Sequence, residues 1–221
     1  RYGDTQAQGF GLRGQAMNLL ILGEWDEAEQ LAQAAVSRYA ASNDQIGEAD
    51  AWGLMALINL RQQRYRRALV NAEQVIKLVT DRAPTSYNLI IAYYATAETL
   101  LTLYERDNGS EDDKLKTFIV PLLTVFRSYA RRFSIGKPRH RLYLGRWYWL
   151  TGKHNQAKKL WHEGIKAADQ LNMPYDKALL QYELGIRTDD EQEKQTFLHQ
   201  ATQIFDTLGA KMDRDGEITA V

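Results

Sequence analysis

The six-residue stretch at residues 23–28, Gly-Glu-Trp-Asp-Glu-Ala, belongs to a pattern that occurs three times in the chain. Residues 63–68 read Gln-Arg-Tyr-Arg-Arg-Ala, with Gln in place of Gly, and residues 152–157 read Gly-Lys-His-Asn-Gln-Ala, with His in place of the aromatic residue. The closing Ala of the first copy lies 40 positions before that of the second, and a further 89 positions lead to the third. The chain is therefore built from a repeated unit.

Each copy of the pattern lies between two segments with helical periodicity. Around residues 63–68, apolar residues recur every three or four positions from Trp52 to Leu60 and again from Ala68 to Val79. This spacing is typical of helices and not of strands. Gly tolerates the backbone conformation at the end of a first helix, and the small Ala lets the second helix pack closely against it. The pattern predicts the tight turn of a helical hairpin.

These residues resemble the tetratricopeptide (TPR) repeat. The positions that match its bulky, small, Gly, aromatic and Ala residues are Leu12, Ala16, Gly23, Trp25, Ala28 and Ala32; Trp52, Ala56, Tyr65, Ala68 and Ala72; and Gly145, Tyr148, Gly152 and Ala157. Trp161 stands where the repeat has a small residue, and the units are nearer 40 residues than the usual length of about 34. The resemblance implies an all-α fold, a right-handed superhelix (solenoid) of about five hairpins and ten helices.

The other hairpins are less regular. We expect Pro84 to lie in the first turn of a helix that continues to Leu101, followed by a helix over about 114–132 with a late start or a kink at Pro121. A last hairpin begins near Pro174 and turns at residues 188–190. No linker divides the chain, so we expect one solenoid domain over residues 1–211 and a tail over 212–221.

A narrower resemblance covers residues 138–185. This stretch is similar to the C-terminal helical repeats of large signalling proteins with a STAND-type ATPase module, many of which also carry an adenylate/guanylate cyclase or protein kinase domain. The chain starts at Arg1 without an initiator Met or an apolar signal region, so we expect a fragment of a longer protein or a processed chain. The absence of cysteine fits a reducing cytoplasm. The alternative implied by the resemblance is the regulatory region of such a cyclase or kinase, whose catalytic part lies outside the fragment.

Composition excludes several kinds of chemistry. The chain has no cysteine, which rules out disulfides, zinc–thiolate sites and thiol nucleophiles. No apolar run is long enough for a membrane span. His162-Glu163 begins like a zinc-protease motif, but Lys166 stands where the second His is needed. No nucleophile with a neighbouring base is visible, so we expect no catalytic site and no cofactor in this fragment.

Residues 131–134, Arg-Arg-Phe-Ser, resemble a site for kinases that read upstream Arg. Short sequences of this kind are common by chance, and the pattern alone does not establish a modification site.

Charge is distributed unevenly, although the chain has 28 basic and 28 acidic residues. Residues 1–60 have a net charge of −5, residues 117–166 have +10 and residues 167–221 have −6. The basic segment either solubilises outer helix faces or forms a groove for an acidic peptide or domain. Its layout is also compatible with head-to-tail self-association. Nucleic acid is a less favoured partner, because the ends of the chain are acidic.

Candidate binding residues follow from the resemblance, which places certain first-helix positions on the inner face of a repeat. Arg and aromatic residues at such positions are typical of protein-binding hot spots. The predicted protein-binding residues are Arg13, Met17, Asp50, Arg61, Arg139, Tyr143, Arg146, Trp149 and Tyr182. The expected partner is a peptide, a helix or a neighbouring domain.

Overall fold

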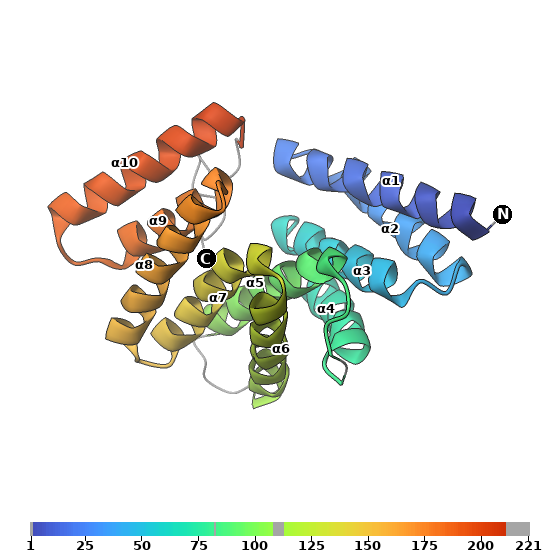
Figure 1. Ribbon diagram of the computed structural model, residues 1–221, viewed down its shortest axis with the longest axis horizontal. Helices are drawn as coiled ribbons and strands as arrows, with labels where there is room; N and C mark the ends of the chain where they lie inside the picture. Colours follow the sequence, from blue (N-terminus) through green and yellow to red (C-terminus); the bar gives the residue numbers. More distant parts are fainter. Residues whose placement is uncertain (1, 82, 108–112, 211–221) are drawn as a thin grey trace. The chain divides into compact units, whose positions relative to one another are not determined.

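The computed structural model describes residues 2–81, 83–107 and 113–210. Within them the chain is all-α, with ten α-helices, two short 3₁₀-helices and no strand (Figure 1). This confirms the predicted all-α class and the predicted number of helices, whereas the right-handed superhelix stays a prediction. The chain divides into two compact units, residues 1–129 (unit 1) and residues 130–221 (unit 2). The single domain over 1–211 stays a prediction, and the tail over 212–221 lies outside the described residues.

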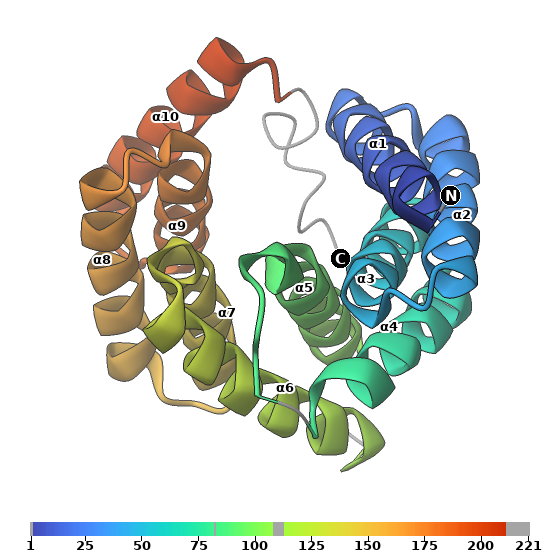
Figure 2. The same cartoon turned by 45° about the vertical axis from the view of Figure 1, so that its right-hand side comes forward.

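Unit 1 contains the first three hairpins. Its helices are α1 (Tyr2–Leu22), α2 (Trp25–Ala41), α3 (Gln45–Arg61), α4 (Tyr65–Val79), η1 (Tyr87–Leu89), α5 (Ile90–Arg106) and most of α6 (Asp113–Arg132). α1 packs against α2, α3 packs against α4, α2 packs against α3, and α3 packs against α5. Figures 1 and 2 show α1 to α4 side by side in this order.

Unit 2 contains two further hairpins. Its helices are η2 (Ser134–Gly136), α7 (Lys137–Leu150), α8 (His154–Gln170), α9 (Pro174–Arg187) and α10 (Glu191–Leu208). The packing follows the same scheme: α7 on α8, α8 on α9, α7 on α9, and α9 on α10. The predicted turn at 188–190 is confirmed, since Asp190 caps α10 by accepting a hydrogen bond from the Glu193 backbone N–H at 2.9 Å.

The three copies of the six-residue pattern form the same turn. The backbone N–H of Glu24, Arg64 and Lys153 donates in each case to the carbonyl five residues earlier, at 2.9, 2.8 and 2.8 Å. The preceding residue has positive φ in all three, 86° at Gly23, 56° at Gln63 and 79° at Gly152. This is the Schellman helix end. The predicted hairpin turns are confirmed, including the one in which Gln replaces Gly.

The large residue at position 161 is accommodated by a glycine on the facing helix. Trp161 is fully buried, and its indole Nε1–H donates to the Leu142 carbonyl at 3.1 Å. A Cβ on Gly145 would lie 2.3 Å from that nitrogen. The large Trp161 ring therefore fits in this hairpin because Gly145 on the facing helix has no Cβ.

Two local predictions for the third hairpin are wrong. Pro84 does not open a helix: the chain is irregular from 83 to 86, and η1 starts after Ser86, whose hydroxyl accepts from the Asn88 backbone N–H and caps the helix there. The late start expected for α6 is also wrong, because α6 begins at Asp113 and continues through Pro121. The alternative, a kink at Pro121, stays a prediction. Side chains of α5 and α6 hold this hairpin together, with the Tyr93 ring 5.4 Å from that of Phe126 and 5.1 Å from that of Tyr129.

Candidate functional site

Ion pairs join the first helices of successive hairpins at a constant sequence separation. In each pair an Arg contacts an Asp or Glu that lies 37 positions later in the chain. The pairs are Arg13–Asp50 between α1 and α3, Arg61–Glu98 between α3 and α5, and Arg139–Asp176 and Arg146–Glu183 between α7 and α9. We call them the first-helix ion pairs. The same separation therefore occurs in both units, although the matching turns at Gly23 and Gln63 in unit 1 are 40 residues apart.

Asp50 joins all three first helices of unit 1. One of its carboxylate oxygens accepts from Arg13 Nη1 of α1, and the other accepts from the Ala92 backbone N–H of α5 at 2.8 Å. The side chain is completely buried. Burial raises the pKa of this carboxyl to about 7, although Arg13 and the Ala92 N–H both act in the opposite direction.

The other predicted residues of unit 1, Met17 and Arg61, also contact side chains of α5. Tyr94 of α5 donates a hydrogen bond to the Met17 sulfur of α1 at 3.5 Å. Arg61 of α3 pairs with Glu98 of α5. The side chains of Arg13 and Arg61 each retain 11% exposure, and Met17 is half-buried. Arg13, Met17 and Arg61 therefore each keep part of the side chain accessible while contacting a neighbouring first helix.

In unit 2, Arg139 is enclosed by groups from α7 and α9. Its Nε donates to Asp176 at 2.5 Å, an Nη1 contact reaches the Tyr143 hydroxyl at 3.4 Å, and its guanidinium lies 5.1 Å from the Tyr175 ring centre. Arg139, Tyr143 and Asp176 are all buried. These side chains serve packing between the two helices.

Glu183 lies between two Arg side chains. Its Oε1 is 3.2 Å from Arg146 Nε, and its Oε2 accepts from Arg187 Nε at 2.7 Å. The Arg146 Nε–H is not aligned for a hydrogen bond with Glu183, so this contact is an ion pair without hydrogen-bond geometry. Both members of the Arg146–Glu183 pair are buried.

Trp149 is packed among side chains that sequence reasoning did not associate with it. The Arg187 guanidinium lies 5.5 Å from its ring centre, His154 stacks on it at 4.2 Å, and Trp161 lies 5.8 Å away. Trp149 nevertheless is only half-buried, as is Tyr182 on α9. Trp149 is thus held in one orientation with part of its ring at the surface.

The nine predicted residues divide into two sets. Four of them, Asp50, Arg139, Tyr143 and Arg146, are buried and have their contacts within the chain. Five retain partial exposure: Arg13, Met17, Arg61, Trp149 and Tyr182. Sequence reasoning missed the partners Glu98, Asp176, Glu183 and Arg187. Aligning the chain with itself at 37 residues, instead of 40, would have placed an acidic residue opposite each of the four Arg.

The same contacts explain part of the uneven charge. Arg139 and Arg146 belong to the basic segment 117–166, while Asp176 and Glu183 belong to the acidic segment that follows it. Arg141 pairs with Glu163 at 3.2 Å on the surface. Part of the positive charge of the basic segment is therefore balanced within unit 2.

In the described part of the chain, no group of three or more His, Asp or Glu side chains is arranged to hold a metal ion.

No family model matches the chain, and no curated protein matches it either. Among the helices in the described ranges, none combines the length and the apolar character that a membrane crossing requires.

Proposed function

We propose that the chain is a TPR-like helical-repeat domain that binds a protein partner and serves a regulatory role in a larger, cytoplasmic signalling protein. The observation that carries the proposal is the constant 37-residue separation of the first-helix ion pairs. Such regularity is typical of stacked hairpins in which each repeat contacts its neighbours, an arrangement that often forms a right-handed superhelix and presents its first helices to a ligand.

The partially exposed members of the predicted set are the proposed contact residues. Unit 1 supplies Arg13, Met17 and Arg61, and unit 2 supplies Trp149 and Tyr182. Arg and large aromatic side chains dominate protein-binding hot spots. The carboxylates behind the Arg residues hold these long side chains in place, which reduces the conformational entropy lost on binding. The proposed partner is a peptide or helix that combines acidic and apolar residues.

Peptide selection tests this proposal. A phage-displayed library of random peptides is selected on the immobilised chain, and fluorescein-labelled copies of enriched peptides are titrated by anisotropy. Enriched peptides should combine acidic and apolar residues. Trp149→Ala or Tyr182→Ala should weaken the binding of peptides that contact unit 2 about tenfold, and Met17→Ala should do the same for unit 1.

Val70→Ala is the matched control, because Val70 is half-exposed on α4 and is not a first-helix residue. It should change affinity less than about twofold. Circular dichroism melting confirms that each variant is folded. The proposal fails if no peptide is enriched, or if every enriched peptide binds the Trp149, Tyr182 and Met17 variants as tightly as the unaltered chain.

A further inference from the structure

The connection between α6 and α7 carries the Arg-Arg-Phe-Ser sequence in an accessible form. α6 ends at Arg132, η2 covers Ser134–Gly136, and α7 begins at Lys137. Arg131, Arg132 and Ser134 are exposed, and so is the apolar residue that follows, Ile135, at 37%. The two basic residues, the hydroxyl group and the apolar residue after it are therefore all at the surface of unit 2.

The hydroxyl of Ser134 differs from those of the other serines that the structure describes. Ser37 and Ser128 donate to the backbone carbonyl one helical turn earlier, Ser42 donates to the end of α2, and Ser86 accepts from a backbone N–H. Within the described ranges, the Ser134 hydroxyl makes no hydrogen bond with the protein. Reaction at this oxygen would break no existing side-chain contact.

The backbone around Ser134 needs little rearrangement to become extended. Phe133 already has extended angles, φ −122° and ψ 108°. The 3₁₀ turn is closed by the Gly136 N–H donating to the Phe133 carbonyl at 3.0 Å and by the Lys137 N–H donating to the Ser134 carbonyl. Short 3₁₀ turns have weak hydrogen-bond geometry, so opening this one for a kinase cleft disrupts few contacts.

We propose that Ser134 is a phosphorylation site for an Arg-directed serine kinase. Acidic groups of the kinase would bind Arg131 and Arg132, which precede Ser134 by three and two positions, and an apolar pocket would take Ile135. Ser134 Oγ attacks the γ-phosphorus of Mg-bound ATP and passes its proton to the kinase's catalytic Asp. The bond from that phosphorus to the β–γ bridging oxygen breaks, and ADP leaves.

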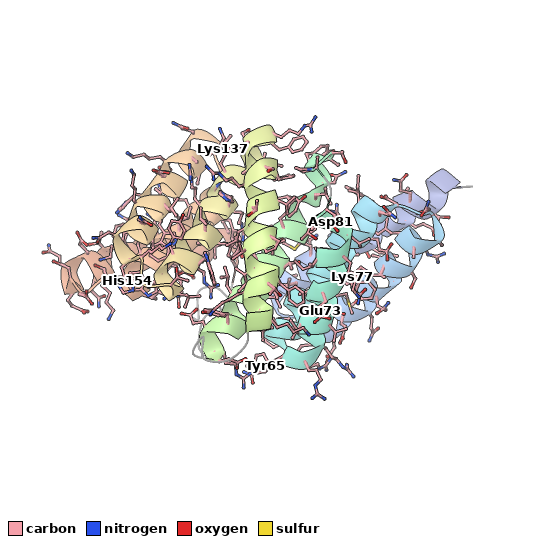
Figure 3. The ribbon with its side chains drawn as sticks, turned by 90° about the horizontal axis from the view of Figure 1, so that it is seen from below. Tyr65, Glu73, Lys77, Asp81, Lys137 and His154 are labelled. Atoms are coloured by element: carbon pink, nitrogen blue, oxygen red, sulfur yellow. The ribbon has the colours of Figure 1, made fainter. Side chains whose placement is uncertain are left out.

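The added phosphate would change the local charge. It carries a charge of about −1.5 to −2 at neutral pH and lies within three residues of Arg131, Arg132 and Lys137. Figure 3 marks Lys137 at the start of α7. An anion near a helix N-terminus is favourable, so the modified turn would gain contacts with the basic side chains around it. The proposal does not depend on the proposed protein-binding function.

The test uses the folded 221-residue chain, Mg-ATP and the catalytic subunit of cAMP-dependent protein kinase as the probe enzyme. Intact-mass spectrometry should show one added phosphate, which fragmentation places on Ser134. Ser134→Ala should abolish the reaction, and Arg131→Ala or Arg132→Ala should lower its rate at least about tenfold. Ser128→Ala, a change at a nearby helical serine, should leave the rate unchanged.

A synthetic peptide of residues 128–139 separates recognition from accessibility. If the peptide is modified while the folded chain is not, the turn is closed to the kinase and the proposal is overturned. It is equally overturned if neither is modified, or if the folded chain is modified elsewhere and not at Ser134.

Discussion

Replacing Glu183 by Ala is expected to lower the free energy of unfolding by about 3–5 kcal/mol. Glu183 is the carboxylate between Arg146 and Arg187, and all three side chains are at most 9% exposed. Removing it leaves two positive charges facing each other in a region with little water. Removing one partner of a buried pair lowers the free energy of unfolding by more than the intact pair raises it. The reason is that the remaining charge stays desolvated.

Urea titration followed by circular dichroism and tryptophan fluorescence measures this change. Glu163→Ala is the matched control, since Glu163 forms a pair with Arg141 on the same unit in which both side chains are 39% exposed. Surface pairs of this kind contribute about 0–1 kcal/mol. Equal destabilisation by the two substitutions would contradict the role assigned to Glu183.

A second large effect is expected from pH. Lowering the pH from about 7 to about 4 should stabilise unit 1 through Asp50, by about 4 kcal/mol in all. Burial raises the pKa of Asp50 from 3.8 to about 7 in the folded chain. Between these values the folded chain holds a proton that the unfolded chain has released. This contribution is therefore largest below about pH 4 and is lost as the pH rises through about 7.

The tyrosines around Asp50 do not reverse the direction in which stability changes with pH. Burial raises the pKa of Tyr39, Tyr93 and Tyr129 above the usual tyrosine value, so these rings stay neutral. Asp44, at the start of α3, adds a smaller repulsion that raises the pKa of Asp50 further. Desolvation of the Asp50 carboxylate is the dominant cause.

Asp50→Asn isolates this effect, because Asn resembles the protonated acid and does not titrate. The free energy of unfolding of both proteins is measured by urea titration from pH 4 to pH 8. The unaltered chain should gain stability relative to the variant as the pH falls. If it loses stability relative to the variant, attraction to Arg13 outweighs desolvation and the assigned pKa direction is wrong.

Local sequence rules predicted the hairpins well. The Gly, aromatic and Ala spacing identified the turns at 23, 63 and 152, because a helix end in the left-handed conformation depends on a few neighbouring residues. The expectation that proline marks the first turn of a helix was wrong at Pro84. There the capping hydroxyl of Ser86, and not the fixed φ of proline, determines where the helix starts.

Contacts between repeats could not be read from local patterns. The Arg residues were recognised as inner-face positions, but their carboxylate partners lie 37 residues away and carry no signal in a short window. Without those partners, Arg139 and Arg146 look like free binding residues, whereas the structure buries both. Trp161 similarly departs from the repeat pattern until Gly145 on the facing helix is considered.

The most direct test of the first-helix ion pairs is a double-mutant cycle on Arg139 and Asp176, using Arg139→Met, Asp176→Ala and the combined variant. The free energy of unfolding of each is measured by urea titration. A pair that joins α7 to α9 at 2.5 Å should give a coupling free energy of about 2–3 kcal/mol, so that the double variant is much less destabilised than the sum of the single ones. Additivity within about 0.5 kcal/mol would contradict the pairing of successive first helices.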